Sequence, residues 1–161
     1  MYKNKLIPSC PAWFTKICIK PRYNVNGIEI LWDIPEYTGL EDIDKHALRP
    51  DGKIILEHEK IIYVLEMSVP WIENRGKKFE EKEEKYQLIV QNIKISKPGY
   101  VVKQLTFIMD CLGGYSKDLT ANLKLLKFTQ SEVDKIIFGM QKIILSEATA
   151  ITRYFKILTT K

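Results

Sequence analysis

The fold is decided by one stretch of sequence, DGKIILEHEKIIYVLEMSVP, which is residues 51–70. Two apolar, β-branched runs, 54–56 and 61–65, are separated by four polar residues, 57–60. Loops of this length are common in β-hairpins, so the stretch predicts two antiparallel strands joined at 57–60. In that register position 56 faces position 61, and position 55 faces position 62.

Two carboxylates face each other in this register. Continuing the ladder away from the loop places Asp51 opposite Glu66, with Cβ atoms roughly 4.5–5.5 Å apart. Like charges at this distance repel unless a cation lies between them. Mg²⁺ takes oxygen ligands from one or two carboxylates and keeps several waters, so the pair predicts a metal site. The segment Pro50-Asp51-Gly52 is also a strong β-turn signal, in which Asp51 would bond only backbone amides.

Residues 77–95 have the periodicity of an amphipathic helix. Its apolar side chains recur at spacings of three, four and seven: Phe79, Tyr86, Ile89, Val90 and Ile93. Lys82 falls inside this stripe and Lys85 lies at its edge. Seven other charged residues of the helix are expected to face water: Lys77, Lys78, Glu80, Glu81, Glu83, Glu84 and Lys94. A lysine in a core-facing stripe needs an anion, which the acidic pair or a substrate phosphate would supply.

This ordered set resembles the restriction-like endonuclease domain of site-specific non-LTR retrotransposons, a branch of the PD-(D/E)xK nuclease superfamily. The residues that carry the resemblance are Pro50-Asp51, then Glu66 with Ser68, then Lys82, Lys85 and Tyr86 on the following helix. The resemblance covers roughly residues 45–115. In the commoner form of the superfamily a lysine stands two residues after the second acid, where this chain has Ser68. The retrotransposon branch is similar in carrying its lysine on the next helix.

The resemblance implies an Mg²⁺- or Mn²⁺-dependent DNA endonuclease that nicks its target by phosphodiester hydrolysis. It also implies a partner, the reverse transcriptase domain of the same element, and a nuclear location. The implied catalytic residues are Asp51, Glu66, Lys82, Lys85 and Tyr86, with Asp51, Glu66 and the Met67 backbone carbonyl as metal ligands. Either Lys82 or Lys85 is the catalytic lysine, and the sequence leaves this choice open.

Composition agrees with a polyanionic partner inside the cell. The net charge is +5 with a pI near 9.0, and the candidate DNA contacts are Arg75, Lys77, Lys78 and Lys103. The three cysteines are odd in number and widely spaced, which favours reduced thiols and an intracellular location. No apolar run is long enough to span a membrane, and no secretory signal is expected at the N-terminus.

The rest of the chain divides into short elements within one expected domain, 1–161. Its core would span about 27–115, with 1–26 and 116–158 as additions. The first 25 residues are expected to be irregular because of three prolines, apart from a candidate strand at 13–19. The other expected elements are a strand at 28–32, a loop or short helix at 36–48, a strand at 100–109 and helices at 116–127 and 129–157. The last helix begins with a capping box, Thr129 to Glu132.

The expected fold class is therefore α/β: a mixed central β-sheet flanked by helices, with a restriction-endonuclease-like core and a long C-terminal helix. The helix between the strand of Glu66 and the strand at 100–109 is a crossover, so these two strands should be parallel. The superfamily core begins with a helix, and this chain shows no clear pattern for one.

Two other functions fit the same residues. One is a catalytically inactive nucleic-acid-binding module of the same fold, which Ser68 at the usual lysine position favours. The other is a structural or interaction domain, in which Asp51 belongs to a turn and Glu66 forms an ion pair with Lys82. A junction resolvase of the same superfamily is a close relative of the main interpretation.

Overall fold

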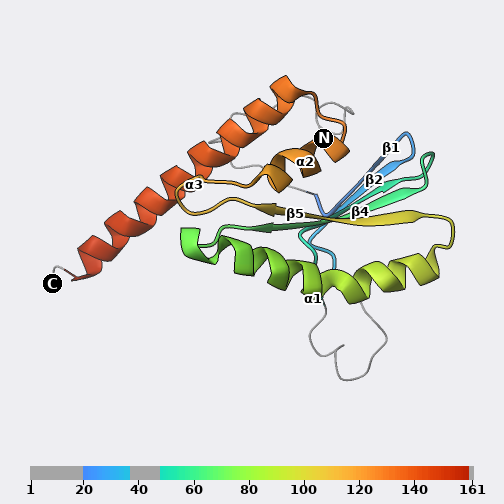
Figure 1. Cartoon of the computed structure of the whole chain (residues 1–161), viewed down its shortest axis with the longest axis horizontal. Helices are drawn as coiled ribbons and strands as arrows, with labels where there is room; N and C mark the ends of the chain where they lie inside the picture. Colours follow the sequence, from blue (N-terminus) through green and yellow to red (C-terminus); the bar gives the residue numbers. More distant parts are fainter. Residues whose placement is uncertain (1–19, 37–47, 160–161) are drawn as a thin grey trace. The chain divides into compact units, whose positions relative to one another are not determined.

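The computed structural model describes residues 20–36 and 48–159. The strand expected at 13–19 and most of the segment expected at 36–48 lie outside the described residues. The elements are β1 (Arg22–Val25), β2 (Ile28–Trp32), β3 (Gly52–Leu56), β4 (Ile61–Ser68), a short 3-10 helix η3 (Ile72–Asn74), α1 (Arg75–Ser96), β5 (Val101–Ile108), α2 (Lys117–Leu125) and α3 (Gln130–Thr159) (Figure 1). The expected fold class, α/β with a mixed sheet and a long C-terminal helix, is confirmed.

The chain forms two compact units. The first contains Met1–Met67 and Glu80–Thr106, and the second contains Ser68–Phe79 and Phe107–Lys161. Each unit is described by itself below. That both belong to one domain stays a prediction.

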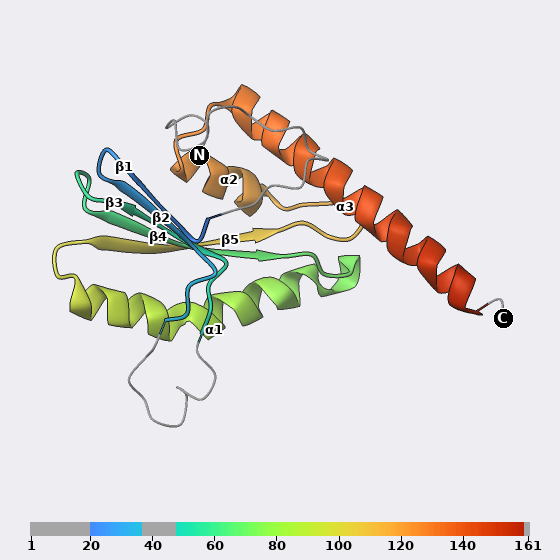
Figure 2. The same ribbon diagram turned by 180° about the vertical axis from the view of Figure 1, so that it is seen from behind.

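The five strands form one sheet in the order β1-β2-β3-β4-β5 (Figure 2). The first three pairings are antiparallel. The amide of Val101 donates to the carbonyl of Lys60 at 2.8 Å, and the amide of Met109 donates to that of Ser68 at 3.3 Å. Both bonds advance along β4 and β5 in the same direction, so these strands are parallel. The predicted crossover through α1 is confirmed.

The hairpin of β3 and β4 has the predicted register. Leu56 pairs with Ile61 and Gly52 pairs with Leu65, so the loop is residues 57–60. One further step along the ladder brings Asp51 opposite Glu66. Gly52 is the first residue of β3, and a side chain there would collide with the indole of Trp32. Asp51-Gly52 is therefore the entry to a strand and not the centre of a turn.

Strand β1 corrects the expectation of an irregular N-terminal segment for residues 22–25. It is joined to β2 by Asn26 and Gly27, both with positive φ, 52° and 74°. Asn-Gly is the preferred pair for a two-residue hairpin turn, which needs positive φ at both positions. Pro21, the last of the three prolines within the first 25 residues, lies just before β1, so it does not interrupt the pairing of β1 with β2. The local turn signal outweighs the proline content.

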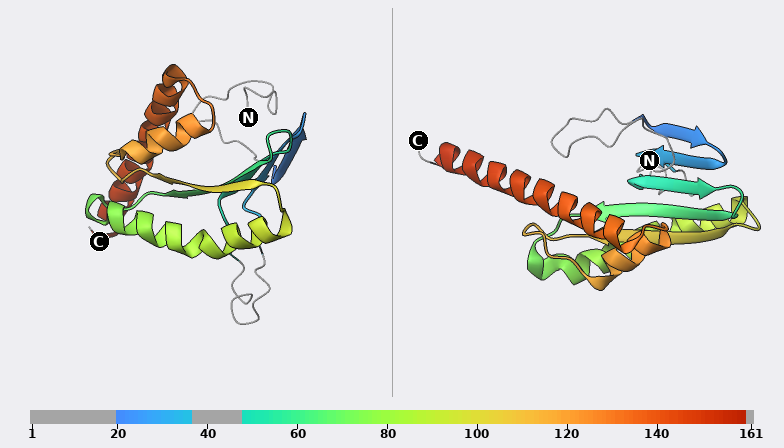
Figure 3. Two further views of the ribbon diagram at one scale, coloured as in Figure 1. Left: turned by 45° about the vertical axis from the view of Figure 1, so that its right-hand side comes forward. Right: turned by 90° about the horizontal axis from the view of Figure 1, so that it is seen from above.

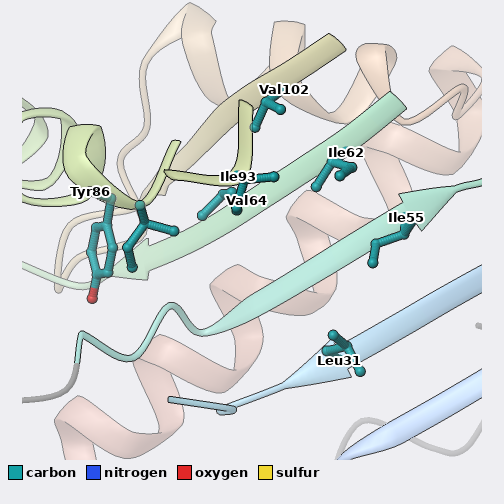
Figure 4. Packing of buried hydrophobic residues seen from close by; sticks show 8 residues of the cluster. Leu31, Ile55, Ile62, Val64, Tyr86, Ile93 and Val102 are labelled. Carbon is teal, nitrogen blue, oxygen red and sulfur yellow. The ribbon is translucent and has the colours of Figure 1, made fainter. Parts of the chain in front are cut away.

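Helix α1 covers one face of the first unit's sheet. The cluster beneath it consists of Leu31, Ile55, Ile62, Val64, Tyr86, Ile89, Ile93 and Val102. Figure 4 shows Tyr86 and Ile93 of α1 beside strand residues of this cluster. The predicted apolar stripe of the helix is thus its buried face. Burial of such side chains contributes roughly 1.5–3 kcal/mol each, which anchors the helix to the sheet.

In the second unit, α2 packs on α3. Among the described side chains of these helices, Leu119, Leu123, Val133 and Ile137 are buried. The predicted capping box is confirmed, since Thr129 N–H donates to Glu132 Oε2 at 2.8 Å and Glu132 N–H donates to Thr129 Oγ1 at 3.4 Å. Figure 3 shows α3 as one uninterrupted helix. No helix in the described part of the chain has the length and apolar character needed to cross a membrane.

Gly52→Ala is expected to lower the free energy of unfolding. The added Cβ would lie 2.8 Å from Cζ3 of Trp32 and 3.4 Å from Cδ1 of Leu65. Overpacking of this kind costs about 1–3 kcal/mol. The control is Gly139→Ala inside α3, where a Cβ meets nothing within 4 Å, and this change should stabilise by about 0.5–1 kcal/mol. Urea denaturation measures both, and similar effects of the two changes would contradict the close packing at Gly52.

Candidate active site

Asp51 and Glu66 lie side by side at the ends of two adjacent strands. Asp51 Oδ2 accepts a hydrogen bond from the amide of Met67 at 2.6 Å. The Asp51 amide donates to Glu66 Oε2 at 3.4 Å. The Asp51 carboxylate therefore contacts the neighbouring strand instead of its own turn. The structure brings the two predicted carboxylates together through the hairpin register.

Glu66 is buried beneath α1, with 1% of its surface exposed. It shares a face of β4 with Ile62 and Val64, because side chains alternate along a strand. A charged carboxylate in such an environment is costly unless it is paired. Its partner is the Lys82 ammonium, which forms an ion pair with Glu66 Oε1.

The structure distinguishes the two candidate lysines. Lys82 retains 19% side-chain exposure and contacts Glu66. Lys85 is exposed, and its Nζ lies 4.9 Å from the centroid of the Tyr86 ring. Only Lys82, of these two, is brought to the acidic pair, as expected for a side chain within the apolar stripe.

Tyr86 is a core residue with its polar end at the site. The ring is buried, and the hydroxyl donates to the Arg49 carbonyl at 2.9 Å. Burial of the ring, followed by the charge of Glu66 and a hydrogen bond to it, and then the charge of Asp51, raises the pKa of Tyr86 well above its ordinary value. Tyr86 is therefore a neutral residue beside the carboxylates, whose hydroxyl proton is donated to the main chain at Arg49.

Three polar side chains near the site were missed by sequence reasoning. Gln104 Nε2 donates to the backbone carbonyl of Lys82 at 2.8 Å, and Thr106 Oγ1 donates to Glu83 Oε1 at 2.6 Å. These bonds tie β5 to α1 beside the ion pair. Glu83 was expected to face water. It is instead half-buried, and its carboxylate accepts the hydrogen bond from Thr106. The available signal was the pair of polar residues at alternate positions, 104 and 106, which share one face of the strand.

The predicted DNA contacts fall into two groups. Lys77 and Lys103 are exposed, and Lys78 is half-buried. Arg75 Nη1 lies 3.3 Å from Oδ2 of the buried Asp110, so it forms an ion pair within the fold. Arg75 therefore balances a buried carboxylate, which needs such a cation, and its contact with DNA stays a prediction.

The donor chemistry of the site fits a hard divalent cation. Asp51 and Glu66 supply carboxylate oxygens, and the main chain of Met67 lies against Asp51. Within residues 20–36 and 48–159, no group of three or more His, Cys, Asp or Glu side chains is placed to hold a metal. The ligand set would consist of the two carboxylates, the predicted Met67 carbonyl and waters, which is a set that Mg²⁺ accepts.

Comparison with protein-family models, with curated proteins and with solved structures finds no match to this chain. The chemistry of the site is therefore inferred from its own side chains. Two carboxylates, a lysine in contact with one of them and a neutral phenol are enough to hold a cation, to neutralise an anionic substrate and to orient a water molecule.

Lys82→Met is expected to lower the free energy of unfolding by about 3 kcal/mol. This is the lower end of the usual cost of breaking a buried ion pair, because Lys82 is partly exposed. The reason is that Glu66 would stay buried without a counter-charge. The control Lys85→Met should change stability by less than about 0.5 kcal/mol. The double variant Glu66→Gln/Lys82→Met should be more stable than Lys82→Met alone. Additive effects in this cycle, measured by urea denaturation, would rule out coupling between the two side chains.

Tyr86→Phe is expected to alter how stability depends on alkaline pH. The folded-state pKa of Tyr86 is raised, so above pH about 10 the unfolded chain loses this proton while the folded chain keeps it. The parent should therefore lose stability as pH rises above about 10, and Tyr86→Phe should lose less. The other tyrosines are present in both proteins, so their contributions to the pH dependence cancel in the comparison. Unfolding free energies at pH 8 and pH 11 provide the measurement, and parallel pH profiles would contradict the raised pKa.

Proposed function

We propose that this protein is a metal-dependent DNA endonuclease that nicks DNA by hydrolysis of a phosphodiester bond. One observation carries the proposal: Asp51 and Glu66 lie side by side, and Lys82 reaches Glu66 from α1. Acids of this kind with a nearby lysine supply both a cation site and a positive charge for a phosphate. The resemblance to restriction-like endonuclease domains supports the same reaction.

The carboxylates would hold Mg²⁺ or Mn²⁺, with the Met67 backbone carbonyl as a further ligand. A bound ion of this type lowers the pKa of a water molecule and neutralises charge on the scissile phosphate. The amide of Met67 holds the carboxylate of Asp51 in place, and the amide of Asp51 faces Glu66 Oε2. Such contacts fix the orientation of the ligands before the cation arrives.

Lys82 is the catalytic lysine of the proposal. Its ammonium donates to Glu66 Oε1, and from this position it would orient the attacking water or stabilise the negative charge that develops on the phosphate. Tyr86, neutral and buried, would hold the main chain just before Asp51 through its hydroxyl, which donates to the Arg49 carbonyl. Lys85 is exposed next to this ring and would contact the DNA strand.

The biological setting of the proposal comes from the resemblance. The DNA target would be chromosomal, the partner would be the reverse transcriptase domain of the same retrotransposon, and the location would be nuclear. Lys77, Lys78 and Lys103 would contribute phosphate contacts, which make binding weaker as salt increases.

Supercoiled plasmid incubated with Mn²⁺, Mg²⁺ or EDTA tests the proposal. The parent protein should nick the plasmid only with the metal ions. Asp51→Asn, Glu66→Gln and Lys82→Met should each lower the rate on the order of 100-fold or more, because each removes a charge that acts on the phosphate or the cation. Circular dichroism confirms which variants remain folded, and Asp51→Asn is the most informative because its amide oxygen can still accept from Met67.

The matched controls are Glu147→Gln and Lys124→Met, which change exposed residues of α3 and α2 and should keep the parental rate. Nicking that survives Asp51→Asn and Glu66→Gln would overturn the proposed site. A parent that binds DNA without any metal-dependent cleavage would favour the inactive nucleic-acid-binding module instead.

A further inference from the structure

The connection between β4 and α1 exposes an unusual amount of apolar surface. The side chains of Val69, Trp71 and Ile72 are 54%, 71% and 48% exposed. Single apolar residues on a surface are ordinary, but tryptophan is normally well buried, and three such residues within four positions form a patch. This patch together with Lys77 and Lys78 is called the Trp71 surface.

The backbone beneath the patch is held in place within the second unit. The Cys111 amide donates to the Pro70 carbonyl at 3.0 Å, and the Asn74 amide donates to the Trp71 carbonyl at 3.0 Å. The ion pair between Arg75 and the buried Asp110 adds a third attachment. The indole therefore stands on a fixed segment, which lowers the conformational entropy lost when a ligand stacks on it.

Residues 73–78 carry one acidic side chain, Glu73, and three basic ones, so the charge next to the patch is positive overall. Arg75, Lys77 and Lys78 lie in the first turn of α1, which has no acidic residue. Cations are unfavourable at this end of a helix because the backbone dipole is positive there. Asp110 offsets the charge of Arg75, and an anionic ligand near Lys77 and Lys78 would interact favourably with both the lysines and the helix dipole.

We propose that the Trp71 surface binds single-stranded nucleic acid, with a base stacked on the indole and phosphates beside Lys77 and Lys78. Aromatic side chains bordered by cations are the usual means of binding single strands, because every unpaired base offers a flat π-face. In a duplex these faces are covered by neighbouring bases. The centres of protein–protein interfaces are instead depleted of charged residues. The inference stands independently of the proposed hydrolysis.

Fluorescence anisotropy with labelled dT20, labelled U20 and a 20-base-pair duplex tests the inference. EDTA is present so that no strand is cut. Trp71→Ala should weaken binding of the single strands about 5- to 100-fold and leave duplex binding unchanged, whereas Trp71→Phe should lose less. The control is Ile95→Ala, which removes an exposed apolar side chain near the C-terminal end of α1. It should leave binding of the single strands unchanged.

The lysines are tested by the salt dependence of single-strand binding. Lys77→Gln and Lys78→Gln should each reduce the slope of log affinity against log salt by about 0.7, the value for one phosphate contact. Lys124→Gln serves as the control. Parental affinity for the single strands in Trp71→Ala, or equal losses for the single strands and the duplex, would overturn the inference. Binding of the parent protein to vesicles of phosphatidylserine and phosphatidylcholine would also overturn the inference if Trp71→Ala weakened that binding and left oligonucleotide binding unchanged.

Discussion

The buried ion pair between Glu66 and Lys82 is the constraint on which the rest of the first unit depends. A carboxylate on the apolar face of β4 is tolerated only if a cation reaches it, and Lys82 of α1 supplies that cation. The rotation of α1 about its axis is therefore set by two requirements at once, the apolar stripe around Ile89 and the position of Lys82. Gln104 adds a third, because it binds the Lys82 carbonyl from β5.

This arrangement is an expensive way to stabilise a fold. Replacing a buried ion pair by apolar residues of similar volume is often neutral, or stabilising by about 1–4 kcal/mol. A second carboxylate, Asp51, next to the first adds repulsion and would be avoided in a purely structural core. Stability alone thus does not account for Asp51, Glu66 and Lys82 in one place. The proposed role in binding a cation and an anionic substrate would account for them, and the Tyr86 hydroxyl holds the main chain next to Asp51 by donating to the Arg49 carbonyl.

Local patterns in the sequence predicted the parts of this site that depend on periodicity and loop length. The period-two pattern and the four-residue loop determined the hairpin register, and with it the contact of Asp51 with Glu66. The helical stripe predicted that Lys82 faces inward. The bonds of β5 to α1 were not predictable in this way, because Thr106 and Glu83 meet only after the crossover places the strand beside the helix. Strand β1 was missed for a different reason, since the proline count was given more weight than the Asn26-Gly27 turn.

The most direct test of the account is paramagnetic broadening of backbone amide signals by Mn²⁺ in NMR spectra. The account predicts that substoichiometric Mn²⁺ broadens the amides around Asp51 and Met67 first, and that Glu66→Gln abolishes this selective effect. Mg²⁺ in excess should restore the signals, because it competes for the same oxygen ligands. Broadening centred elsewhere, or unchanged in Glu66→Gln, would contradict the claim that Asp51 and Glu66 form a metal site.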